Sequence, residues 1–140
     1  MLRLRTILTA LAVLTLSTTT LLAQVRMRTG NWENTATSHG RTATRSHCLK
    51  PADAAASNGS PAIVRAETEK ALSKVGCKLK DFRLDDNTLT ETMVCRSFTT
   101  LQETKFHGGD SFETMTTHLA EGVQVAKMKG RRIGDCKAGE

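Results

Sequence analysis

Four cysteines, Cys48, Cys77, Cys95 and Cys136, constrain the fold of this chain more than any other feature. All four follow an N-terminal segment with the layout of a secretory signal, and cysteines of exported proteins usually pair in an oxidising compartment. None of them is close enough in sequence to another to form the C-x-x-C knuckle of a zinc site. The sequence therefore predicts two disulfides and no bound metal.

The N-terminal segment contains the parts of a signal peptide. Arg3 and Arg5 give it a basic start, an apolar run broken by two threonines follows, and a Thr-rich patch leads to a cleavage site after Ala23. The apolar run is shorter than the roughly 20 residues of a membrane-spanning helix. We predict a signal peptide over residues 1–23 and a single exported β-rich domain over residues 24–140, with no transmembrane segment after cleavage. An uncleaved N-terminal anchor is the alternative.

The composition indicates a thin hydrophobic core. The chain has four Phe, one Trp at position 32 and no Tyr, so few large side chains are available for burial. Covalent cross-links compensate for such a core in small exported domains. The net charge of +6 is not gathered into the basic stripe with interleaved aromatics that nucleic-acid binding requires, so we expect no nucleic-acid partner.

Strand-like segments joined by short turns fill most of the exported part. The pattern predicts a strand around Trp32 and another over residues 41–49. After Gly76, threonines become frequent in segments that are separated by the turn signals Asp85-Asp86-Asn87 and Gly108-Gly109. We expect a mainly β (α+β) fold, an antiparallel meander of about six to seven strands that is curved or half-barrel in shape. The later strands are predicted at residues 77–84, 88–96, 98–107, 111–119 and 123–132.

One helix is predicted over residues 60–75, inserted after the second strand. Ser60 suits the N-cap, Pro61 suits the first helical position, and Gly76 suits the residue after the helix. Its buried face is expected to consist of Ile63, Ala66, Ala71, Leu72 and Val75.

Strand register suggests how the cysteines pair. If residues 85–87 form a three-residue loop, Leu84 faces Thr88, and counting outward places Cys77 opposite Cys95. Directly opposed residues in an antiparallel pair have Cβ atoms about 4.5–5.5 Å apart, which is near the separation of a disulfide.

The same register sets Asp81 against Glu91, a like-charge pair that an alternative loop would avoid. A disulfide closing about 15–20 residues is worth on the order of 3 kcal/mol, whereas an exposed charge pair is worth less than about 1 kcal/mol. The sequence therefore favours the cysteine match. The prediction is Cys77–Cys95 with Cys48–Cys136, and the rival is Cys48–Cys77 with Cys95–Cys136.

A series of short motifs runs through the exported part. They are Gly30-x-Trp32-Glu33, Cys48-Leu49-x-Pro51-x-Asp53-Ala54, Cys77, Asn87-x-Leu89-Thr90 leading to Cys95, Gly109-Asp110-Ser111-Phe112, and Met128-x-Gly130-Arg131-Arg132-Ile133-Gly134-x-Cys136. In this order they resemble a family of small exported bacterial proteins that is catalogued as domain of unknown function 3617. The resemblance implies a periplasmic location in a Gram-negative bacterium, and it implies no activity.

Catalytic patterns are weak throughout the chain. The stretch Gly109-Asp110-Ser111 is similar to the nucleophile motif of one esterase class, but the tail lacks the histidine that such an enzyme needs, so a hairpin turn is favoured. The histidines are scattered, and the acidic cluster Asp81, Asp85, Asp86 and Glu91 is expected to be solvated around a hairpin tip. We predict no catalytic residue and no cofactor.

Basic residues on the predicted last strand form the candidate binding surface. Lys127, Lys129 and Arg131 share one face because strand side chains alternate, and Arg132 is expected to join them. This candidate anion-binding face suits lipid phosphates, a peptidoglycan carboxylate or an acidic protein. The alternative is a solvated face that protects the sheet from aggregation.

Two functions remain at this stage. The first is an exported periplasmic accessory or binding protein whose curved sheet holds an envelope component or a small apolar ligand. The second is a periplasmic hydrolase-type enzyme whose site is assembled from distant residues. A pocket with converging acids or histidines favours the enzyme, and an apolar concavity favours the binding protein.

Overall fold

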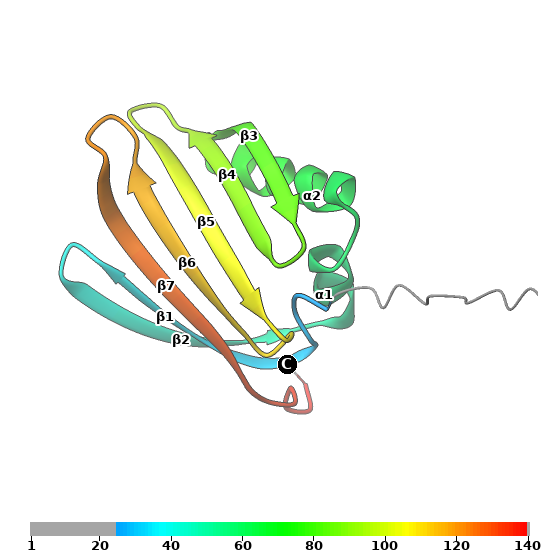
Figure 1. Ribbon diagram of the computed structural model, residues 1–140. Coiled ribbons are helices and arrows are strands. Elements are labelled where there is room, and N and C mark those ends of the chain that lie inside the picture. The colour runs from blue at the N-terminus through cyan, green and yellow to red at the C-terminus, as the bar shows by residue number, and fades with distance from the viewer. Residues whose placement is uncertain (1–24, 140) are drawn as a thin grey trace, which may run out of the picture.

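A computed structural model describes residues 25–139, so the predicted signal peptide lies outside the described residues. Seven strands form one curved, open sheet with the spatial order β2-β1-β7-β6-β5-β4-β3 (Figure 1). Every neighbouring pair is antiparallel, which confirms the predicted fold class. The elements are β1 (Gly30–Ser38), β2 (Arg41–Leu49), α1 (Pro51–Ser57), α2 (Pro61–Lys74), β3 (Lys78–Asp85), β4 (Thr88–Val94), β5 (Thr99–His107), β6 (Ser111–His118) and β7 (Val123–Gly134).

The two helices carry the chain between the two edges of the sheet. Strand β2 forms one edge and β3 forms the other, and only α1 and α2 separate them in sequence. Strands β3 to β7 then follow one another back across the sheet until β7 pairs with β1. No helix among residues 25–139 is both long enough and apolar enough to cross a membrane.

Helix α2 begins and ends at the predicted signals. The Ser60 hydroxyl accepts a hydrogen bond from the Ile63 amide, and Gly76 adopts a φ of 73° just beyond the helix. The prediction of a single helix was incomplete, because Pro51 begins the short helix α1 rather than only ending a strand. Proline is favoured in the first turn of a helix, where its missing N–H has no partner to lose.

The predicted buried face of α2 was partly wrong, although Ala71 and Leu72 do line pockets against the sheet. Ile63 and Val75 are 50% and 71% exposed, whereas Val64 is buried. Val64, Thr68 and Ala71 line a pocket between the helix and the sheet, at the four- and three-residue spacing of one helix face. The sequence pattern failed here because the face that meets the sheet includes a threonine.

The hydrophobic core is small and lies where α1 meets the sheet. Trp32 is completely buried and packs with Leu49, Ala54 and Phe112. The Trp32 indole N–H donates a hydrogen bond of 2.9 Å to the Arg28 carbonyl, so its one polar atom is satisfied. We call the face of the sheet that carries Trp32 and Phe112 the inner face.

Two disulfides fasten the sheet. The pairs are Cys48–Cys136 and Cys77–Cys95, with Cα atoms 5.3 and 4.2 Å apart, and these are the pairs favoured by the sequence. The first joins the end of edge strand β2 to the segment after β7. The second joins the residue before β3 to the residue after β4.

The register that led to this pairing was partly wrong. Asp85 faces Thr88, so the turn has two residues, and Asp81 faces Thr92 rather than Glu91. A bulge between Leu79 and Asp81 then shifts the register by one residue and restores the predicted pairing of Leu79 with Met93. The cysteines meet because the bulge cancels the shorter turn, and the expected like-charge pair does not form.

Candidate functional site

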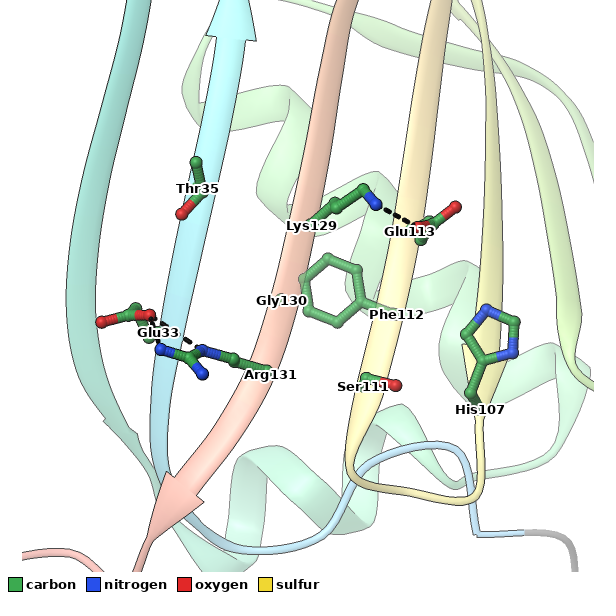
Figure 2. A pocket seen from close by; sticks show the side chains of 9 residues that line it. All are labelled: Glu33, Thr35, His107, Ser111, Phe112, Glu113, Lys129, Gly130 and Arg131. Atoms are coloured by element: carbon green, nitrogen blue, oxygen red, sulfur yellow. Dashed lines mark hydrogen bonds and ion pairs between the residues drawn. The ribbon is translucent and has the colours of Figure 1, made fainter.

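The predicted basic face lies beside a pocket on the side of the sheet away from the helices (Figure 2). This outer pocket has a volume of about 490 Å³. Gly130 on β7 and Phe112 on β6 face each other across the sheet and belong to the lining of this pocket. The remaining lining residues are Glu33, Thr35, His107, Ser111, Glu113, Lys129 and Arg131.

Carboxylates offset the positive charges around the outer pocket. Lys129 Nζ lies 2.7 Å from Glu113 Oε1, and Arg131 Nη2 lies 2.7 Å from Glu33 Oε1 (Figure 2). The hydrogen bond and the charge of Lys129 lower the pKa of Glu113, which keeps that carboxylate ionised. The outer pocket therefore alternates positive and negative groups, and its attraction for an anion is reduced.

The four residues of the predicted anion-binding face do not gather in one place. Lys127 and Lys129 are two residues apart on β7 and face the same side as Arg131. The Arg132 guanidinium instead donates a 2.7 Å hydrogen bond from Nε to the Thr29 carbonyl and pairs with Asp135. Within residues 25–139, Lys127 is the one member of the set that forms no ion pair. Anion binding by this face stays a prediction.

A second and more apolar pocket opens on the inner face. This inner pocket has a volume of about 590 Å³, within the range of about 300–1,000 Å³ that is usual for small-molecule sites. The sequence carries no local signal for it, because its walls come from a helix, a disulfide, four strands and their turns. The lining residues are His39, Leu72, Cys77, Met93, Cys95, Phe98, Thr100, Thr116, His118, Glu121 and Val125.

The sheet register explains how the inner pocket is built. Met93 on β4 faces Thr100 on β5, and Thr100 faces His118 on β6, so the three form a row across the sheet. The Phe98 ring packs near the His118 ring, with centroids 6.4 Å apart. The disulfide Cys77–Cys95 holds the end of α2 beside this row, which adds Leu72 to the wall.

His118 and Glu121 form an imidazole–carboxylate pair in the lining of the inner pocket, which also includes His39. His118 Nδ1 lies 3.9 Å from Glu121 Oε2. His118 is the last residue of β6, and Glu121 follows three residues later in the turn. The Nδ1 atom is buried and makes no hydrogen bond within the described part of the chain.

A buried carboxyl group lies on the inner face, between the two ends of the sheet. Glu91 is only 5% exposed and accepts a 3.0 Å hydrogen bond from the Thr68 hydroxyl of α2. Burial raises the pKa of Glu91, and the hydrogen bond from Thr68 opposes that rise. The expectation that Glu91 would be solvated at a hairpin tip was wrong, because the residue alternates in phase with the inward-facing Leu89 and Met93.

Groups of three or more His, Cys, Asp or Glu residues that could hold a metal ion do not occur within residues 25–139. The stretch Gly109-Asp110-Ser111 lies at the β5–β6 hairpin, as expected. Gly108 and Gly109 have φ values of 60° and 80°, and the Asp110 amide donates to the His107 carbonyl, which closes the turn.

The chain forms a small, cross-linked β-rich domain. It contains an open antiparallel sheet, two disulfides and an apolar inner pocket, and its two helices connect the edge strands β2 and β3 in sequence. The chain belongs to the family described as protein of unknown function (DUF3617), whose model matches residues 27–136. No match was found among curated proteins or among solved structures.

Proposed function

We propose that the protein is an exported binding protein whose inner pocket holds a small ligand with a mainly apolar body. The observation that carries this proposal is the apolar lining of the inner pocket, to which Leu72, Met93, Phe98 and Val125 contribute. Ligand sites are commonly lined by apolar side chains with a few polar groups that fix orientation. Thr100, Thr116 and His118 supply such groups here.

The position of the core supports the same proposal. Trp32 and its neighbours fill the inner face near α1, whereas the end of the sheet near Phe98 has no comparable filling. Phe98 is 44% exposed although it lies in a pocket wall. Burying such apolar surface on binding a ligand is favourable by roughly 25 cal/mol per Å².

Export is the second part of the proposal. It is supported by the signal-like layout of residues 1–23 and by the two disulfides, which persist in oxidising compartments. We expect intact-mass analysis of a periplasmic fraction to give a chain that begins at Gln24. Recovery of the full-length chain from the cytoplasm alone would contradict this part.

Binding is tested with the neutral fluorescent probe N-phenyl-1-naphthylamine. We expect saturable fluorescence enhancement with the wild-type protein and its loss in Met93→Lys, which places a charge in the inner pocket. The matched control is Met115→Lys, because Met115 is 44% exposed and lies on β6 away from this pocket. Equal binding by both variants would contradict the proposal.

The alternative is a hydrolase, and one observation favours it. Glu121 and His118 form a carboxylate–imidazole pair within a pocket that also contains the Thr100 and Thr116 hydroxyls. Such a pair can orient a general base. Turnover of a naphthyl or nitrophenyl ester that disappears in His118→Phe and persists in His107→Phe would support this alternative.

A further inference from the structure

The identity of the polar group on the ligand can be inferred from His118. The ring belongs to the wall of the inner pocket and packs near Phe98. Its Nδ1 atom is buried and lies 3.9 Å from Oε2 of the Glu121 carboxylate. A carboxylate beside one ring nitrogen favours the tautomer in which that nitrogen carries the proton.

This tautomer leaves the other ring nitrogen as an acceptor. A neutral imidazole has one donor and one acceptor, so a proton on Nδ1 gives Nε2 a free lone pair. Within residues 25–139, the one polar contact of the His118 ring is the 3.9 Å approach of Nδ1 to Glu121. A ligand that fills the pocket and covers this ring would leave Nε2 without a partner unless the ligand supplies a donor. An unpaired buried acceptor costs about 1–3 kcal/mol.

The charges around the pocket argue against an anionic ligand. Glu121 lies in the wall, and no lysine or arginine does. A carboxylate or phosphate group near His118 would be repelled by Glu121. Its oxygens are hydrogen-bond acceptors, so they could not bond to the acceptor Nε2. A hydroxyl group avoids both penalties, because it is uncharged and donates its proton.

We propose, building on the proposed function, that the inner pocket selects an uncharged amphiphile whose apolar body ends in a hydroxyl group, and that this hydroxyl donates a hydrogen bond to Nε2 of His118. Glu121 is a positioning residue in this arrangement, because its negative charge favours the proton on Nδ1, on the far side of the ring. The apolar body lies along Met93, Leu72 and Phe98.

The test is displacement of N-phenyl-1-naphthylamine by three matched ligands: decanol, decyl methyl ether, which lacks the donor, and decanoate, which is anionic. We expect decanol to bind about fivefold to tenfold more tightly than either of the others, the effect of one net hydrogen bond. His118→Phe should remove this preference while the probe still binds. His107→Phe, an exposed position on the outer pocket, should leave the preference unchanged.

Glu121→Gln provides a second readout that a purely structural role would not affect. Loss of the charge should strengthen decanoate binding relative to decanol, because the repulsion disappears. Equal affinity of the wild-type protein for all three ligands would overturn the hydroxyl selectivity and leave the proposed function standing. Absence of saturable binding by the probe and by all three ligands would overturn both.

Discussion

Glu91 is a carboxyl group that folding removes from water and places below Thr68 of α2. Because desolvation raises its pKa in the folded state, the folded protein binds this proton more tightly than the unfolded chain does. The contribution of Glu91 to stability is therefore fully present below its unfolded pKa. It is lost as the pH rises through the raised pKa of the folded state.

We predict that Glu91→Gln stabilises the protein at neutral pH by about 1–2 kcal/mol, since the amide keeps an acceptor for Thr68 without a buried charge. Urea unfolding from pH 4 to pH 8 measures the effect. The free energy of unfolding of the wild type should decline as the pH rises, and that of the variant should decline less. Glu113→Gln is the control of opposite sign. In the wild type, the exposed carboxylate of Glu113 has a lowered pKa, so its contribution to the free energy of unfolding is lost as the pH falls. Parallel curves for wild type and Glu91→Gln would contradict the prediction.

Gly130 is a residue whose missing side chain the fold requires. A Cβ atom at this position would lie 2.1 Å from Cε1 of Phe112, which is part of the core. We predict that Gly130→Ala destabilises the protein by about 1–3 kcal/mol, the usual cost of overpacking. Thermal unfolding measures the loss, and adding Phe112→Leu to Gly130→Ala should recover part of it. A double variant in which the two losses simply add would show that the contact is not the cause.

Each disulfide fastens a different part of the sheet. Cys77–Cys95 closes the β3–β4 hairpin, and Cys48–Cys136 ties the segment after β7 to the end of β2. In the chain-entropy account, the bridge across 88 residues stabilises more than the bridge across 18 residues. We predict that replacing Cys77 and Cys95 by Ser costs about 3 kcal/mol, and that replacing Cys48 and Cys136 by Ser costs about 1 kcal/mol more. Urea unfolding of the two double variants provides the comparison.

Peptide mapping without reduction checks the pairing itself. Cleavage inside the β3–β4 hairpin should release a linked pair of peptides that contain Cys77 and Cys95. A linked pair with Cys48 and Cys77 would overturn the assignment and, with it, the wall of the inner pocket.

Elements with a local chemical signal could be predicted from the sequence. Ser60, Pro61 and Gly76 mark the ends of α2, and the two glycines at 108 and 109 mark the β5–β6 turn. Features set by contacts between elements could not be predicted. Examples are the bulge beside Leu79 and the face of α2 that places Val64 near Leu84 and Leu89.

At the scale of the whole molecule, the pairing of β1 with β7 builds one side of the outer pocket. This pairing brings Glu33 beside Arg131, although the two residues are 98 positions apart in the sequence. Strand alternation is enough to place Lys127, Lys129 and Arg131 on one face, but no local signal in the sequence points to the carboxylates that meet Lys129 and Arg131. The inner pocket was missed for the same reason, because its wall joins His39 at the β1–β2 turn to Leu72 on α2.

The outer face gives the last prediction, which follows from this long-range pairing. Because Glu33 and Glu113 offset Arg131 and Lys129, the wild-type protein should bind anionic lipid vesicles weakly, with an affinity that falls as salt is added. The double variant Glu33→Gln/Glu113→Gln uncovers both cations and should bind the same vesicles more tightly in a sedimentation assay. Charge reversal at Lys127 and Lys129 should abolish the binding and lower stability by no more than about 1 kcal/mol, because the Lys129–Glu113 ion pair that it breaks lies at the surface. Wild-type binding as tight as that of the double variant would show that the carboxylates do not mask the face, and a large loss of stability on charge reversal would show that the two lysines are not exposed.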